Sequence, residues 1–139
     1  MYLLDTNVVS ELRKIRTGRA DPHVKAWSDN QSLEATFLSV ITIMELEQGT
    51  LLMERRDPGQ GTMLREWLDG QIQREFDGRV LPIDTQIAKR CAALHVPDPC
   101  SYRDSLIAAT ALVHSMTVVT RNVSHFAPCG VKVFNPWEA

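Results

Sequence analysis

Short apolar segments that alternate with helical patterns constrain the fold of this chain more than any other feature. The first segment, Tyr2 to Leu4, is apolar at successive positions and therefore presents apolar side chains to both faces of a sheet. Such a strand is typical of the centre of a parallel sheet covered by helices on each side. The other expected strands are Ala35 to Leu38, Arg79 to Asp84, Thr117 to Thr120 and Val131 to Phe134.

Helical patterns fill the segments between these strands. Strands that alternate with helices predict an α/β fold, a three-layer α/β/α arrangement with a mainly parallel central sheet of four to five strands. We expect residues 1–139 to form a single domain, since the length suits one ordinary domain. The expected helices are Thr6 to about Lys14 with Thr6 as its cap, a short helix starting at Asp21-Pro22, about Ile41 to Arg56, an amphipathic helix over Thr62 to Phe76, a helix carrying Ile87, Cys91 and Leu94, and Ser101 to Met116.

Composition excludes several classes of protein. The net charge of −2 gives no overall basic field for non-specific nucleic-acid binding, so any RNA or DNA contact must be local. Three cysteines cannot all pair within one chain, which suits a reducing compartment. The apolar runs are far shorter than the roughly 20 residues of a membrane span, and no leader precedes "MYLLD". We therefore expect a cytoplasmic protein without membrane contact.

Three acidic residues stand at corresponding places in this pattern. Asp5 ends the first strand, Glu45 lies early in the helix after the second, and Asp104 lies in the first turn of the helix before the fourth. Because ligands of open parallel sheets bind beyond the carboxyl ends of the strands, these acids are expected to meet at one edge.

Each acid also has a purely structural interpretation. Asp5 would satisfy free amides of the next helix, and Thr42-x-x-Glu45 and Ser101-x-x-Asp104 resemble capping boxes, each worth about 1 kcal/mol. Three carboxylates roughly 5 Å apart, however, repel by about 3 kcal/mol per pair at an effective dielectric constant near 20. Caps cannot offset that repulsion. Convergence therefore requires shared protons or a divalent cation, and all-oxygen ligation suits Mg²⁺ or Mn²⁺.

Five motifs together resemble those of PIN-domain ribonucleases, in particular the VapC and FitB-like toxins of bacterial toxin–antitoxin pairs. They are "LLDTN", "SVITIMELEQG", "YRDSLIAATAL", "TVVTRNVSHF" and "VKVFNPWE", and they run in order along essentially the whole chain. The resemblance implies a PIN-like fold and a metal-dependent endoribonuclease. Its mechanism would be in-line attack of a metal-activated water on an RNA phosphodiester.

The resemblance also assigns roles to individual residues. The matching catalytic and metal-binding acids are Asp5, Glu45 and Asp104. The fourth acidic position of the family falls on Asn122, and His125 stands where "DF" often follows, so one negative charge is missing and a second metal ion is in doubt. Thr6, Asn7 and Thr120 resemble supporting polar residues. The candidate substrate contacts in these motifs are Arg121 and His125. Apart from the resemblance, a local basic run of Arg13, Lys14, Arg16 and Arg19 makes Arg13 and Lys14 candidates for phosphate contact, although the run also fits a solvated helix end.

The partners implied are an RNA substrate, a cognate VapB/FitA-like antitoxin and a second copy of the chain in a homodimer. DNA would be reached only through the antitoxin. A segment of the antitoxin is expected to cover the acidic pocket, where an arginine or lysine would be attracted.

Other functions stay open at this point. A zinc site at Cys91, His95 and Cys100 lacks a fourth ligand at a typical spacing. Neither G-x-G-x-x-G nor G-x-x-x-x-G-K-[ST] follows any expected strand, which argues against a dehydrogenase or P-loop enzyme. A PIN-like binding module that has lost catalysis is favoured by Asn122, and a single-strand DNA nuclease would share the same metal chemistry.

Overall fold

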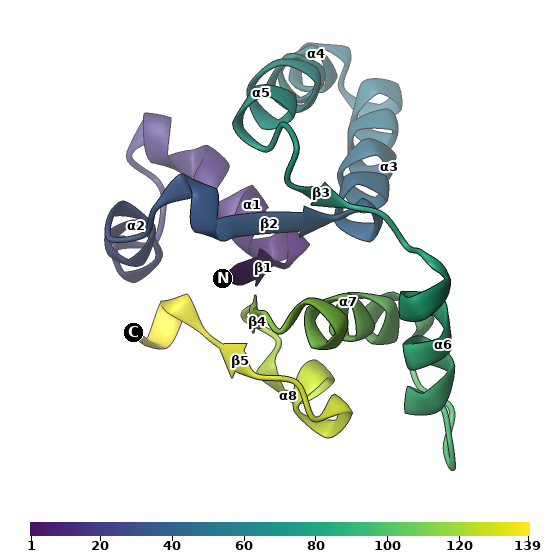
Figure 1. Cartoon of the computed structure of the whole chain (residues 1–139). Helices are drawn as coiled ribbons and strands as arrows, with labels where there is room; N and C mark the ends of the chain where they lie inside the picture. The colour runs from purple at the N-terminus through teal and green to yellow at the C-terminus, as the bar shows by residue number, and fades with distance from the viewer.

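The computed structural model describes residues 1–139, and its five strands form one sheet in which every pair is parallel (Figure 1). The strand order is β3-β2-β1-β4-β5, so the first strand lies at the centre, as expected. The strands are β1 (Tyr2–Leu4), β2 (Thr36–Ser39), β3 (Val80–Leu81), β4 (Thr117–Val119) and β5 (Val133–Phe134).

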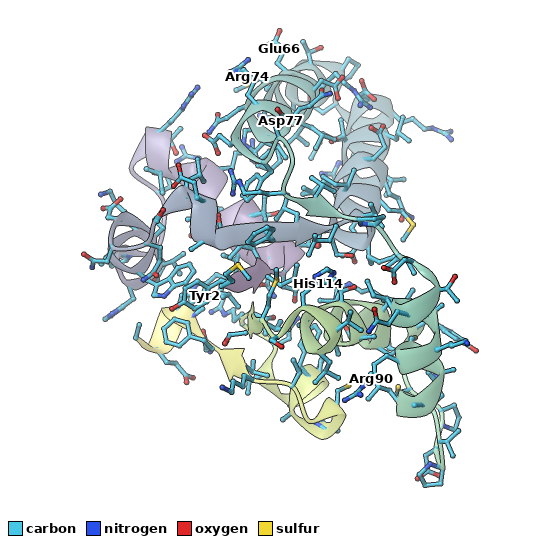
Figure 2. The ribbon with its side chains drawn as sticks, in the orientation of Figure 1. Tyr2, Glu66, Arg74, Asp77, Arg90 and His114 are labelled. Atoms are coloured by element: carbon cyan, nitrogen blue, oxygen red, sulfur yellow. The ribbon has the colours of Figure 1, made fainter.

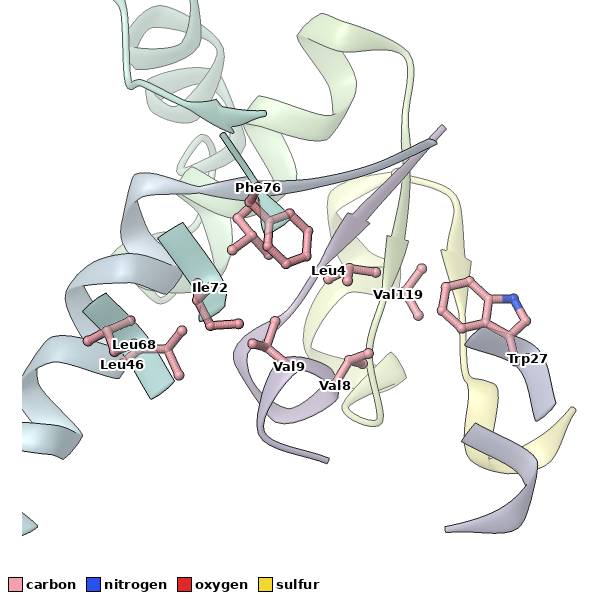
Figure 3. Packing of buried hydrophobic residues seen from close by; sticks show 10 residues of the cluster. Leu4, Val8, Val9, Trp27, Leu46, Leu68, Ile72, Phe76 and Val119 are labelled. Carbon is pink, nitrogen blue, oxygen red and sulfur yellow. The ribbon is translucent and has the colours of Figure 1, made fainter. Parts of the chain in front are cut away.

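Both faces of the sheet are covered, as the apolar composition of β1 predicts. The buried Leu4 packs on one face in a cluster that includes Val9 and Phe76 (Figure 3). Its neighbour Leu3 packs on the other face with Ile107 and Phe126. Successive strand residues point to opposite faces, so two apolar residues in a row need a helix layer on each side. The predicted three-layer α/β/α fold is confirmed.

The helices agree with the sequence patterns to within a few residues. One correction concerns the first helix, because Asp5 caps it in place of Thr6: the Asp5 carboxylate accepts a hydrogen bond from the Thr6 backbone N–H. The helices are α1 (Thr6–Arg13), α2 (Pro22–Asp29), α3 (Val40–Arg56), α4 (Pro58–Glu66), α5 (Gln73–Glu75), α6 (Thr85–Leu94), α7 (Tyr102–His114) and α8 (Val123–Phe126).

The proline- and glycine-rich segment 57–61 interrupts the helical structure at one residue only, Asp57. Asp57 ends α3 and caps α4, and Pro58 takes the first position of α4, where its missing N–H costs nothing. Gly61 lies inside α4 where α4 crosses α3. A Cβ at this position would stand 2.5 Å from the Glu54 Cα, so only glycine permits this approach of the two helices.

The expected amphipathic helix over Thr62 to Phe76 is continuous but changes pitch. A π-helical stretch, Trp67–Ile72, joins α4 to α5. Its apolar side chains Leu68 and Ile72 are buried, whereas Glu66, Arg74 and Asp77 are exposed on the outer side of this segment (Figure 2). The apolar pattern therefore identifies the buried face although it does not reveal the change of pitch.

The topology marks one edge of the sheet as special. After β1 the chain builds β2 and β3 on one side, then crosses to build β4 and β5 on the other. The order thus reverses at β1, and in open parallel sheets ligands bind at the carboxyl ends of the strands at such a point. Asp5 directly follows β1, and Thr120 directly follows β4.

None of the helices combines the length and the apolar character that a membrane crossing requires.

Candidate active site

Asp5 is fully buried at the carboxyl end of the central strand. Its backbone N–H extends the β1–β4 ladder by donating to the Val119 carbonyl at 2.9 Å. Its carboxylate accepts from the Thr6 N–H at 2.8 Å and from the Thr120 hydroxyl at 2.7 Å. A buried carboxylate is tolerated only when such donors surround it, so the sheet and the start of α1 fix the position of this charge.

Glu45 reaches the same edge from α3. The structure corrects the capping-box interpretation of this residue, because Ser39 caps α3 and Thr42 therefore lies inside the helix. One Glu45 carboxylate oxygen accepts a hydrogen bond from the Thr6 hydroxyl at 2.5 Å. Glu45 is thus held by a side chain from α1, which follows the central strand.

Asp104 belongs to the first turn of α7, as the sequence predicts. The Ser101 hydroxyl caps this helix by accepting from the Asp104 backbone N–H at 3.3 Å. This contact is one half of the expected capping box. The Asp104 carboxylate turns instead toward the sheet edge, where it meets an arginine.

Arg103 joins the three acids. Its Nη2 donates to Asp5 Oδ1 at 2.5 Å, its Nε donates to Glu45 Oε2 at 2.5 Å, and its Nη1 donates to the Asp104 carboxylate. Each nitrogen of one planar group therefore binds a different carboxylate. The structure brings all three expected acids to one place, around a cation that the sequence reasoning did not identify.

The charge on Arg103 explains how the acids coexist. Burial opposes the charged form of this side chain, but the hydrogen bond to Glu45 and the charge of Asp5 outweigh it, so the pKa of Arg103 is raised above its usual range. Shared protons and a divalent ion are the two solutions expected from the sequence. A guanidinium of the chain is a third solution, and its signal was a basic residue directly before an expected acid in "YRDS".

Thr6, Asn7 and Thr120 form a hydrogen-bonded layer beneath the acids. The Thr120 hydroxyl donates to Asp5 and accepts from the Asn122 backbone N–H at 3.0 Å and from the Asn7 amide at 3.4 Å. The Asn7 side-chain oxygen in turn accepts from the Arg121 N–H at 3.3 Å. These contacts tie the segment after β4 to the segment after β1.

Asn122 and His125 lie beside this layer. Asn122 enters the network through its backbone N–H, and its carbonyl accepts from the His125 N–H at 3.0 Å. The His125 ring lies near the acids, with Nδ1 3.6 Å from Asp104 Oδ2, and slightly more than half of its side chain is exposed at 54%. His125 therefore stands between the acids and solvent.

The other candidate substrate contacts lie away from the acids. The Arg121 guanidinium lies over the Trp137 ring, 5.1 Å from its centroid. Arg13 and Lys14 stand at the far end of α1, about 12 Å along the helix from Asp5 at 1.5 Å per residue. Arg13 lies over the Trp67 ring and lines a separate, partly apolar groove of about 400 Å³, and Lys14 pairs with Glu11. In this arrangement neither Arg13 nor Lys14 lies beside the acidic cluster.

The zinc alternative finds no support. Both nitrogens of the His95 ring are engaged, since Nδ1 accepts from the Cys100 N–H at 3.2 Å and Nε2 lies 2.9 Å from the Ser105 hydroxyl. The Cys91 thiol also contacts the Ser105 hydroxyl, and all three cysteines are free. No three histidine, cysteine or carboxylate side chains in the chain are grouped so that they could hold an ion, and this holds for the three acids as they lie around Arg103.

Comparison with known proteins places this chain in a family. The sequence model of the PIN domain family matches residues 2–127 of this chain. The chain is 39% identical to the VapC ribonuclease Y4jK of Sinorhizobium fredii over 99% of both chains. It is 40% identical to the Toxin FitB of Neisseria gonorrhoeae, again over 99% of both.

Solved structures agree with these relatives. The crystal structure of FitAcB from Neisseria gonorrhoeae superposes with a TM-score of 0.90 at 38% identity and covers 100% of both chains. A toxin–antitoxin complex from Klebsiella pneumoniae superposes with a TM-score of 0.64 at 27% identity over 98% of both chains. The expected resemblance is confirmed over the full length of the sheet and its helices, and the chain belongs to the PIN-domain family.

Proposed function

We propose that this chain is a metal-dependent endoribonuclease that hydrolyses RNA phosphodiester bonds and acts as the toxin of a toxin–antitoxin pair. The observation that carries the proposal is the convergence of Asp5 at the end of β1, Glu45 on α3 and Asp104 on α7 on one guanidinium. One buried and two partly exposed acids that repel one another are costly to stability, so their convergence indicates a role in binding a cation. The similarity to a VapC ribonuclease supports RNA as the substrate.

The donor set fits Mg²⁺ or Mn²⁺. All three side chains offer carboxylate oxygens, which these hard cations prefer, and the site already accommodates a positive charge in the form of Arg103. Asp5, Glu45 and Asp104 would hold the ion. When bound, it would supply Lewis-acid chemistry and neutralise negative charge on the phosphodiester.

The neighbouring residues orient these carboxylates. The Thr6 N–H and the Thr120 hydroxyl bind opposite oxygens of Asp5, so this carboxylate cannot rotate without losing a hydrogen bond. The Thr6 hydroxyl does the same for Glu45. The exposed His125 beside Asp104 is placed to contact the phosphate or ribose of an incoming RNA strand. Asn122 would act through its backbone, in support of Thr120.

The proposed partners follow from the relatives. Similarity to Toxin FitB and to a chain of a toxin–antitoxin complex supports a cognate antitoxin as partner, with DNA reached only through it. The acidic pocket would accept a basic side chain of that antitoxin. We further propose that the whole chain works as a single cytoplasmic PIN domain and forms a homodimer.

RNA cleavage by the purified, partner-free chain tests this function. We expect cleavage of structured or single-stranded RNA in Mg²⁺ or Mn²⁺, loss of cleavage in EDTA, and loss in Asp5→Asn. Asp21→Asn is the matched control, because Asp21 likewise caps a helix, α2, but lies outside the acidic cluster. Equal activity of the parent chain and Asp5→Asn would contradict the proposal.

A second candidate function is a binding module that no longer cleaves. The observation that favours it is Asn122, which leaves the position after β4 without the acid expected from the family pattern. In the same assay this module would cleave neither RNA nor single-stranded DNA in any metal, yet bind its antitoxin normally. Cleavage of single-stranded DNA without cleavage of RNA would instead identify a DNA nuclease with the same site.

A further inference from the structure

Arg103 occupies the position that a metal ion would need. The oxygens it binds are one from each acid: Oδ1 of Asp5, Oε2 of Glu45 and an oxygen of Asp104. A divalent ion must approach such oxygens to about 2.0–2.6 Å. The guanidinium and a metal ion cannot bind these oxygens at the same time, because they would overlap sterically and their positive charges would repel each other. This inference rests on the proposed metal-dependent function.

We propose that Arg103 is the built-in counter-cation of the metal-free site and that it must swing out before a divalent ion can bind. The side chain closes the site when the ion is absent and competes with the ion for the same carboxylates. Arg103 is therefore a positioning residue that sets the metal affinity of the chain.

The grouping of the acids supports the competition. The arrangement in which Arg103 binds all three acids contains no group of three potential ligands that could hold an ion. After the guanidinium leaves, the same carboxylate oxygens are free to close around an ion. Three ionised acids and one arginine leave two negative charges uncompensated, and an ion of charge +2 in place of the arginine leaves only one.

The location of Arg103 gives it a way out. Its side chain is 29% exposed, similar to Glu45 at 26%, whereas Asp5 is completely buried, so the arginine reaches solvent without displacing Asp5. It stands in the first turn of α7, where a positive side chain is disfavoured by the helix dipole. The ion pairs must therefore hold it inward. When those ion pairs break, the partly exposed side chain turns toward solvent, and the freed carboxylates can then bind a metal ion.

A second arginine in the chain provides a matched comparison. Arg65 on α4 also binds three carboxylates, namely Glu47 at 2.7 Å, Glu54 at 3.1 Å and Asp69 at 3.4 Å. Glu47 is two residues after Glu45 on α3, which places it about 200° around the helix and on a different face. Arg65 thus pairs with the same number of carboxylates as Arg103, but its partners are more exposed to solvent and belong to α3 and the α4 segment, not to the carboxyl ends of the strands.

The test compares Arg103→Gln and Arg65→Gln in the full, partner-free chain. Mn²⁺ binding is followed by the electron paramagnetic resonance signal of the free ion, and thermal unfolding is recorded in EDTA and in Mn²⁺. If the site closed by Arg103 is preferred about tenfold over the open site, the apparent affinity of the parent for Mn²⁺ is reduced by about that factor. We therefore expect R103Q to bind Mn²⁺ about tenfold more tightly than the parent. In EDTA, R103Q should have a lower Tm than the parent. Addition of Mn²⁺ should raise the Tm of R103Q by more than it raises the Tm of the parent. R65Q should lower the Tm and leave the Mn²⁺ affinity unchanged.

The outcomes separate this inference from the proposed function. Unchanged or weaker Mn²⁺ binding by R103Q, in a parent chain that binds Mn²⁺ and cleaves RNA, overturns the inference alone. Absence of Mn²⁺ binding in both parent and R103Q overturns the inference and the metal-dependent function together. Binding by R103Q but not by the parent supports the inference in its strongest form. If R103Q does not fold, R103K answers the same question, since its single ammonium cannot bind three carboxylates at once and should give a smaller gain in affinity.

Discussion

Replacing Thr120 with valine tests the hydrogen-bonded layer that fixes Asp5. The two side chains have nearly the same shape, so the substitution removes the hydroxyl group and little else. Asp5 Oδ2, fully buried, would lose its donor at 2.7 Å, and the Asn122 N–H would lose its acceptor at 3.0 Å. A hydrogen bond to a charged group contributes about 1.5–3 kcal/mol and a neutral one about 0.5–1.5 kcal/mol. We therefore expect T120V to lower the free energy of unfolding by about 2–4 kcal/mol.

Two other fully buried threonines provide controls of identical chemistry. The Thr110 hydroxyl donates to the Leu106 carbonyl of its own helix at 2.8 Å, a weak additional contact, so T110V should cost at most about 1 kcal/mol. The Thr42 hydroxyl is buried with no hydrogen-bond partner, so T42V should be neutral or stabilising by up to about 1 kcal/mol.

The assay is urea denaturation in EDTA, followed by far-ultraviolet circular dichroism for the parent and the three variants. EDTA removes any bound ion, so the measured differences report the protein alone. The predicted order of stability is T42V at or above the parent, then T110V, then T120V lowest. If T120V unfolds within about 0.5 kcal/mol of T42V, the Thr120 hydroxyl does not hold Asp5 and the reasoning fails.

Three further predictions concern other parts of the chain. Gly61→Ala should destabilise the protein by about 1–3 kcal/mol in thermal unfolding, because the added Cβ would meet the backbone of α3. Gly59→Ala is the control: its Cβ would make only an ordinary contact at 3.6 Å, so this variant should be neutral or stabilising by up to about 1 kcal/mol. Equal effects of the two substitutions would contradict the close contact between α3 and α4. In labelling with Ellman's reagent, the exposed Cys100 should react first and Cys129 more slowly, because burial raises the pKa of the Cys129 thiol; faster reaction of Cys129 would refute this. His125→Ala should reduce RNA cleavage roughly tenfold and leave Mn²⁺ affinity within about twofold, and an unchanged cleavage rate would remove His125 from the site.

The order of strands and helices could be predicted because the apolar pattern is a local property. Tyr2–Leu4 needs helices on both faces wherever it lies, and this requirement alone indicates a central parallel strand. Pro82 lacks the backbone N–H that a strand in the middle of a sheet would use, and it directly follows β3, which lies at the edge of the sheet. The short helix α2 began at Pro22 with Asp21 as its cap, as the dipeptide predicts.

Features that depend on contacts between distant segments could not be predicted in the same way. Ser39 caps α3 because β2 ends there, and the sequence pattern of Thr42 and Glu45 imitates a cap one turn later. The start of α4 at Pro58, before the expected helix start at Thr62, depends on the packing of α4 against α3 through Gly61. In both cases the local sequence allows two helix starts of similar energy, and tertiary packing determines which of them forms.

The candidate site shows the same division. Strand ends and helix starts predicted that Asp5, Glu45 and Asp104 would gather, and they do so around one group. Arg103 was missed because a lone arginine beside an acid is ordinary in sequence, and only the fold brings the second and third carboxylates to it. Arg13 was expected to contact substrate from its position in a basic run, but the length of α1 carries it to a different groove.

The central claim is that Asp5, Glu45 and Asp104 together hold one divalent ion after Arg103 has moved aside. The most direct measurement is the anomalous X-ray signal of Mn²⁺ in crystals of the partner-free chain grown with that ion. The account predicts an anomalous peak within coordination distance of an oxygen from each of the three acids, with the Arg103 guanidinium displaced from them. A manganese ion bound elsewhere, or Arg103 still bound to all three acids in crystals saturated with Mn²⁺, would contradict the account.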